Sequence, residues 1–288
     1  MKNILPVTTV LATLLALWYA AAALLNAPLQ ADAFSNAGNT EYSTSQLILA
    51  SWEMERPKLP APHQIVAELY RLTIATPPTS KRGLVYHAII TLEETLIGFL
   101  FGAGFGVALA ALIQSSPALD RSMMPWIVAS QTVPIIALAP MIVVILSQFN
   151  VTGLAPKAVI AAYLSFFPIT VGMVKGFRSP DPLQLDLMRT YSATRAQTFV
   201  KLRAPASAPF FFASMQIGAA AALVGAVVAE VTKSEDGGLG ARLLAGSYYG
   251  QTVQIWAALF AAAVLSATLV GLIALVGRAV LRRMAFSR

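Results

Sequence analysis

The chain has 288 residues, of which 57% are hydrophobic and only 11% are charged, and its mean hydropathy is +0.69. A soluble domain carries roughly a quarter charged residues, so this composition excludes a soluble enzyme and a disordered segment. The formal charge of +7 invites a nucleic-acid-binding interpretation, which the placement of the charges excludes. With no cysteine and only two histidines, the sequence offers no disulfide and no metal cluster. It predicts an integral membrane protein.

Six apolar segments are long enough to cross a bilayer, whose core of about 30 Å needs roughly 20 apolar residues in a helix. They cover about residues 4–25, 84–113, 123–146, 156–177, 210–231 and 253–276. The first is longer than the roughly 7–15 apolar residues of a signal sequence, so we expect a true span, with cleavage near residues 31–33 as the alternative. The predicted fold is therefore all-α, with about six transmembrane helices.

The basic residues indicate the orientation of the chain, because cytoplasmic loops carry an excess of Lys and Arg. With a cytoplasmic N-terminus, twelve of the 20 basic residues and only three acidic ones fall on the inner side. The twelve are Lys2, Arg121, Lys175, Arg178, Arg189, Arg195, Lys201, Arg203, Arg278, Arg282, Arg283 and Arg288. We therefore expect both termini to be cytoplasmic.

The chain divides into three predicted parts. Residues 1–83 hold the first span, a long polar outer segment at 26–62 and a short amphipathic helix at 63–74 on the outer surface. Residues 84–277 form the core, whose largest cytoplasmic excursion is at about 178–209. Residues 278–288 form a basic cytoplasmic tail.

Small residues recur every four positions in two spans and favour close helix packing. One stripe is Gly98, Gly102, Gly106 and Ala110, and the other is Gly218, Ala222 and Ala226. Prolines at 125, 134 and 140 are expected to bend or break the third span. Polar side chains beside such breaks indicate a translocation path, although ordinary kinked packing remains open. The path candidates are Ser130, Gln131, Thr132, Pro134, Ser165, Phe166, Phe167 and Gln216.

Three carboxylates lie near the predicted outer ends of spans: Glu93, Glu94 and Glu230. They are candidates for an acidic outer mouth, and interfacial carboxylates are the alternative. No basic residue lies at the centre of a span, which argues against a path that grips an anion through an ion pair in the membrane. The sequence also lacks a zinc-binding helix, a serine-hydrolase motif and a phosphate-binding loop. We therefore expect a non-catalytic chain that binds no cofactor or metal itself.

The cytoplasmic segment reads DLMRTYSATR at 186–195 and continues to LRAP at 202–205. Four further landmarks surround it: Pro134 and Pro140, FFP at 166–168, GFRSPDP at 176–182, and AE at 229–230 followed by GGLG at 237–240. In this order they resemble the permease subunits of bacterial ABC importers, in the nitrate, sulfonate and taurine branch, over about residues 84–276. The chain departs from the family pattern of Glu-Ala-Ala, three residues and Gly, because Asp186, Leu187-Met188 and Ser192 stand at those positions.

The resemblance implies a type I ABC importer-like permease bundle in the bacterial inner membrane, non-catalytic and paired with a second copy as a homodimer. It implies two cytosolic ATPase subunits that bind ATP and Mg, an extracytoplasmic solute-binding protein, membrane lipid and no nucleic acid as partners. The ATPase-coupling residues that it implies are Asp186, Leu187, Met188, Arg189, Tyr191, Ser192, Ala193, Arg195 and Pro205.

The residues of this loop agree with such a role. Two short helices joined by a turn would present Leu187, Met188 and Tyr191 as an apolar knob surrounded by basic side chains, which suits a groove on a partner. Ser192 does not take a positive φ as cheaply as the glycine it replaces.

The cargo implied is a small organic solute or anion, either sulfonate-, taurine- or nitrate-like, or a pyrimidine-type vitamin precursor. Tyr163, Phe166 and Phe167 favour a neutral or aromatic solute. Two alternative functions are a membrane scaffold or assembly protein and an ion-coupled secondary transporter. Dependence of uptake on ATP rather than on an ion gradient distinguishes them from an importer.

Overall fold

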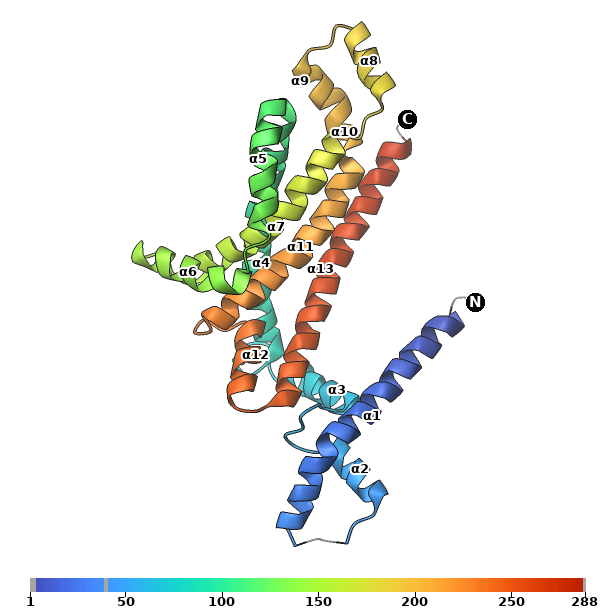
Figure 1. The fold of residues 1–288 in the computed structure, drawn as a ribbon, viewed down its shortest axis with the longest axis vertical. Coiled ribbons are helices and arrows are strands. Elements are labelled where there is room, and N and C mark those ends of the chain that lie inside the picture. The colour runs from blue at the N-terminus through green and yellow to red at the C-terminus, as the bar shows by residue number, and fades with distance from the viewer. Residues whose placement is uncertain (1–3, 39–40, 287–288) are drawn as a thin grey trace. The chain divides into compact units, whose positions relative to one another are not determined.

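The computed structural model describes residues 4–38 and 41–286, and every regular element in these ranges is a helix (Figure 1). The predicted inner-side residues Lys2 and Arg288 lie outside them. The longer elements are α1 (Ile4–Asn36), α4 (Leu84–Ser115), α5 (Pro117–Ser130), α6 (Ile135–Gln148), α7 (Leu154–Phe177), α11 (Ala208–Thr232) and α13 (Thr252–Phe286). The shorter ones are α2 (Thr44–Trp52), α3 (Pro62–Tyr70), α8 (Pro182–Thr190), α9 (Arg195–Thr198), α10 (Ala204–Ala206), α12 (Leu239–Tyr248) and two π-helical turns, η1 (Arg71–Ala75) and η2 (Phe199–Arg203).

Five helices of the described chain are long and apolar enough to cross a membrane, and a sixth crossing is counted if the bent pair α5–α6 is one span. This confirms the predicted fold class. The two helices of the pair meet at 98°. The break lies at residues 131–134, where Pro134 precedes α6, while Pro125 and Pro140 lie inside their helices. At the C-terminus, α13 continues as helix through most of the predicted basic tail.

The chain forms two compact units, residues 1–88 with 241–262, and residues 89–240 with 263–288. In the first unit, the predicted polar outer segment at 26–62 contains helix, because α1 continues to Asn36 and α2 follows. Asn26 is fully buried. Its amide donates to the carbonyls of Ser51 and Leu59, and its Oδ1 accepts from the amides of Lys58 and Leu59. This polar residue therefore ties α1 to the following segment.

Aromatic side chains complete the first unit. The Trp18 indole donates to the Pro60 carbonyl at 3.1 Å, and its ring lies 5.1 Å from that of Trp256. The Trp52 indole donates to the Tyr19 carbonyl at 3.0 Å. The predicted short helix at 63–74 is confirmed as α3 and η1.

In the second unit, α7 packs side by side with α11 and also against α4 (Figure 1). The predicted glycine stripes lie in these contacts. A Cβ at Gly98 would stand 2.4 Å from Ala161 Cβ, and one at Gly218 would stand 2.6 Å from Ile169 Cδ1. Ala222 and Ala226 are fully buried. Only small residues allow the three helices to approach this closely, which confirms the packing role predicted for the stripes.

Candidate functional site

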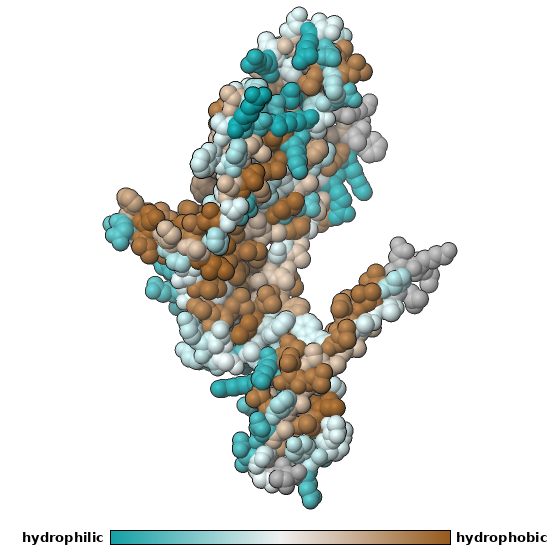
Figure 2. All heavy atoms as spheres, viewed as in Figure 1, coloured by the Kyte–Doolittle hydropathy of each residue, from teal (hydrophilic) through white to brown (hydrophobic). Residues whose placement is uncertain are grey.

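The segment from α8 to α10 (Pro182–Ala206), here called the α8–α10 segment, has the two short helices and the turn that the sequence predicts. Each helix begins at a side-chain cap. The Asp181 carboxylate accepts from the Leu183 amide at 2.8 Å, and the Thr194 hydroxyl accepts from the Gln197 amide at 3.2 Å. Figure 2 shows hydrophilic side chains gathered at this end of the second unit and hydrophobic ones along its helices.

The turn between α8 and α9 places Ser192 in the left-handed region, at a φ of +52°. Its amide donates to the Arg189 carbonyl at 2.8 Å, and the next amide, that of Ala193, donates to the Met188 carbonyl at 3.0 Å. These two bonds form a Schellman motif, which usually has glycine at the left-handed position. The serine therefore stands where the family pattern has its glycine, and the backbone keeps the glycine conformation.

One face of α8 presents apolar side chains to the outside. Leu183, Leu187 and Tyr191 recur every four residues and are 78%, 55% and 76% exposed. Of the other predicted coupling residues, Asp186 and Arg189 form an exposed ion pair at 2.8 Å, and Met188 is half-buried. Ala193 lies in the turn, Arg195 begins α9 and Pro205 lies in α10.

The structure places the predicted path residues in two groups. Gln131, Thr132 and Pro134 are exposed at the break between α5 and α6, and the Ser130 carbonyl there accepts from the Tyr163 hydroxyl. Phe166 is half-buried beside that tyrosine, with ring centroids 5.9 Å apart, and Phe167 and Gln216 are half-buried as well.

Ser165 is instead fully buried, and a Cβ at Gly102 would stand 2.0 Å from its hydroxyl. That serine packs α7 against α4, because the glycine opposite leaves room for its side chain.

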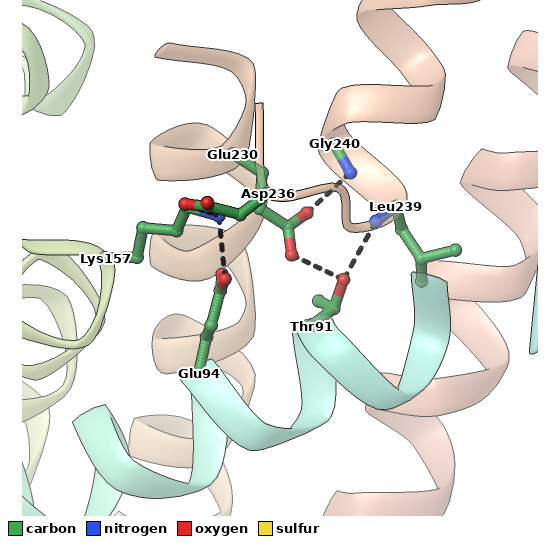
Figure 3. A network of polar contacts seen from close by, with 7 residues as sticks. All are labelled: Thr91, Glu94, Lys157, Glu230, Asp236, Leu239 and Gly240. Carbon is green, nitrogen blue, oxygen red and sulfur yellow. Dashed lines mark hydrogen bonds and ion pairs between the residues drawn. The ribbon is translucent and has the colours of Figure 1, made fainter. Parts of the chain in front are cut away.

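Two of the three predicted outer carboxylates are buried in a polar network of the second unit (Figure 3). Lys157, in the first turn of α7, is fully buried and donates to Glu94 of α4 at 2.8 Å. Asp236, in the loop before α12, lies 3.5 Å from the same ammonium. Glu94 and Glu230 are thus enclosed by protein rather than open to a mouth on this chain, whereas Glu93 is exposed.

Glu230 binds the start of α12. Its carboxylate accepts from the Thr91 hydroxyl and from the Gly240 amide, both at 2.6 Å, and the same hydroxyl accepts from the Leu239 amide at 2.9 Å (Figure 3). The first amides of a helix have no hydrogen-bond partner within the helix and carry partial positive charge. A buried carboxylate at this position both accepts their hydrogen bonds and offsets that charge. A Cβ at Gly238 would stand 2.1 Å from the Glu230 carboxyl carbon. Residue 238 must therefore be glycine, because any side chain there would collide with the carboxylate that caps α12.

Sequence reasoning missed Lys157 and Thr91. A signal for the lysine was available, since a charge at the end of a predicted span needs a counter-charge on another span. Thr91 lies three residues before Glu94, which places the two on one face of α4. No group of three metal-ligating side chains is found in the part of the chain that the structure describes. The contacts of the network hold α4, α7, α11 and the start of α12 together.

Five or six membrane-crossing helices, with a broken pair and a capped helical segment, describe a multi-pass helical membrane protein. The chain belongs to the family described as binding-protein-dependent transport system inner membrane component, whose model matches residues 102–286. It is the permease subunit of an ABC importer, and neither the scaffold nor the secondary-transporter alternative is favoured.

Individual relatives that match this chain are also named as transport permeases. A probable ABC transporter permease protein of Haemophilus influenzae is 30% identical over 62% of this chain and 68% of its own length. The formylaminopyrimidine transport permease protein ThiX of Halalkalibacterium halodurans is 28% identical over 66% of this chain and 74% of its own. A solved inward-facing structure of the MetNI methionine ABC transporter matches with a TM-score of 0.56 and 20% identity, over 69% of this chain and 95% of that one. This last likeness concerns the fold.

Proposed function

We propose that two copies of this chain form the translocation path of the importer, that a separate cytosolic ATPase docks on each α8–α10 segment, and that an extracytoplasmic binding protein delivers the solute. The observation that carries this proposal is the exposed row of Leu183, Leu187 and Tyr191. A row of apolar side chains on one helix face fits a groove on a partner. A tyrosine such as Tyr191 that enters such a groove is a typical anchor, because a few buried residues, often Tyr, Trp or Arg, supply most of the binding energy of an interface.

The geometry of the segment suits the transmission of movement. Arg203 donates to the Phe177 carbonyl at 2.7 Å, which ties η2 to the end of α7. Arg178 pairs with Asp120 of α5 at 2.9 Å. A displacement of α8 and α9 by the ATPase thus acts on the ends of two helices, α7 and α5, through short polar contacts. ATP and Mg belong to the ATPase in this proposal, because the chain has no phosphate-binding loop.

Affinity purification of the tagged chain from its native membranes, followed by mass spectrometry, tests the docking. We expect a soluble ATPase to accompany the chain and to be lost in the double variant Leu187→Asp/Tyr191→Asp. Val200→Asp is the matched control, because this side chain is 66% exposed on η2 and lies off the row. Recovery of no ATPase by the folded chain, or equal loss in the control, would overturn the proposed docking surface.

The proposed orientation, with both termini and the α8–α10 segment in the cytoplasm, has a direct test because the natural chain has no cysteine. Single variants Tyr191→Cys and Glu55→Cys place one thiol on an exposed position of each predicted side, the second in the outer segment 26–62 and outside the predicted spans. In intact cells, a membrane-impermeant maleimide should label the second variant and not the first. The reverse pattern would invert the topology.

For the cargo we propose a small nitrogen heterocycle of the pyrimidine type. The support is the similarity to the formylaminopyrimidine permease, together with the aromatic pair Tyr163 and Phe166 beside the break between α5 and α6. Sulfonate- and nitrate-like anions are the competing class. Ligand binding by the co-purified binding protein tests this: saturable binding of an aminopyrimidine supports the proposal, and binding of taurine, alkyl sulfonate or nitrate alone would overturn it.

A further inference from the structure

Two neighbouring cavities of the second unit differ sharply in character. The larger, of about 980 Å³, lies among α4, α7, α11 and α13 and is walled almost entirely by apolar side chains, including Leu100, Phe211 and Leu272. The smaller, of about 720 Å³, lies between the end of α4 and the α8–α10 segment. Ala111 and Phe199 line both cavities, so the two adjoin.

The smaller cavity is basic. Arg189, Arg195 and Arg203 line it, and no acidic residue is among its lining residues, although Arg189 is paired at 2.8 Å with Asp186 outside the lining and Arg203 donates to the Phe177 carbonyl. Burial, and to a smaller extent the neighbouring Arg178, lowers the pKa of the Arg203 guanidinium. Arginine is the side chain best suited to phosphate, because its planar guanidinium donates two parallel hydrogen bonds. The Gln114 Oε1 atom is buried in this wall without a hydrogen-bond partner and offers an acceptor for a hydroxyl group.

We propose that the two cavities together bind one anionic phospholipid of the adjacent leaflet, with its phosphate in the basic cavity and an acyl chain in the apolar one. An apolar cavity within the membrane region that opens onto a cluster of arginines matches the two chemically different ends of such a lipid. Basic pockets between membrane helices bind anionic headgroups in this way.

The proposed site is separate from the predicted path and from the exposed apolar row, although its basic cavity shares Arg189, Ala193 and Arg195 with the predicted coupling residues. None of the predicted path residues lines the apolar cavity. On α8, the exposed row of Leu183, Leu187 and Tyr191 lies on the face opposite Leu185 and Arg189, since successive helical residues are about 100° apart. The headgroup therefore lies beneath the helix whose outer face is the proposed ATPase contact.

The headgroup half of the proposal is tested with the purified full chain, reconstituted in bilayers of equal phosphatidylglycerol and phosphatidylethanolamine and then examined by native mass spectrometry. We expect retained phosphatidylglycerol to exceed its share of the bilayer. The variant Arg189→Gln/Arg195→Gln should reduce this preference roughly tenfold or more, since each basic side chain near a membrane contributes about fivefold to anionic-lipid binding. Lys201→Gln, an exposed charge of the same segment outside the cavity, should retain it.

A second pair of variants tests whether an acyl chain occupies the apolar cavity. A Cβ at Gly104, in the wall of the apolar cavity, meets no atom within 4 Å, so Gly104→Leu fills the cavity without moving the backbone. Gly271 is equally open but does not line the cavity. We expect Gly104→Leu to lose the retained lipid and Gly271→Leu to keep it.

Three outcomes would overturn the proposal. The first is an unchanged phosphatidylglycerol preference in the double arginine variant, and the second is unchanged lipid retention in Gly104→Leu. The third is a change in oligomeric mass of Gly104→Leu with its lipid intact, which would mean that a second copy of the chain fills the apolar cavity.

Discussion

Replacing Ser192 with glycine is expected to stabilise the turn between α8 and α9. A residue with a Cβ costs roughly 1–2 kcal/mol in the left-handed region that Ser192 occupies. Glycine also lowers the stability of the folded chain by about 0.4–1 kcal/mol, because it gives the unfolded chain more conformational freedom. The difference leaves a gain of about 1 kcal/mol for Ser192→Gly, or about a fivefold shift in the equilibrium between the closed and the open turn.

Hydrogen exchange reports that equilibrium directly, because the Ser192 and Ala193 amides donate the two bonds that close the turn. In the full chain, Ser192→Gly should raise protection of these amides about fivefold. Ser192→Ala keeps the Cβ and should match the natural chain, whereas Ser192→Val, which is branched at Cβ, should lower protection. Equal or lower protection in the glycine variant would refute the strain argument.

Three further predictions concern the polar network and the loop caps. Gly240→Ala brings a Cβ to 2.3 Å from a backbone oxygen of α11, so its unfolding free energy should fall by at least about 2 kcal/mol, while Gly104→Ala should melt like the natural chain. Lys157→Met leaves the buried Glu94 carboxylate without its counter-charge and should destabilise by about 3–5 kcal/mol. Glu94→Met should cost less, because Asp236 still lies 3.5 Å from the ammonium, and the double variant should recover most of the Lys157→Met loss; additive losses in the thermal-melt cycle would contradict the pairing. Thr194→Ala removes the α9 cap and should cost about 1 kcal/mol, seen as faster amide exchange in that helix alone; unchanged exchange would exclude a capping role.

Much of the architecture follows from local sequence patterns. Span positions are predictable because an apolar stretch of about 20 residues has one low-energy arrangement in a bilayer. The glycine stripe at Gly98 and Gly102 is predictable because spacing alone places small residues on one helix face. The turn at Ser192 is predictable because one left-handed residue ends a helix in a recurrent way.

The buried polar residues were not predictable in the same way. Asn26 marks the start of a polar stretch in the sequence, yet it is buried because backbone groups of residues 51–59 come to it. Lys157 and Glu94 are separated by 63 positions, and Glu230 and Thr91 by 139. Whether such a side chain is interfacial or enclosed depends on which partner the tertiary structure brings to it, and hydropathy carries no information on that choice.

The cap on α12 also sets an order of events during synthesis. The groups that satisfy the Leu239 and Gly240 amides reside on α4 and α11, so α12 has no cap until both helices are in the bilayer and side by side. The same assembly neutralises Lys157, which enters the membrane at the start of α7 after its counter-charge Glu94 is already there. Closure of this network thus requires α4, α7 and α11 together, and a chain in which it stays open has Lys157 without the counter-charge of Glu94.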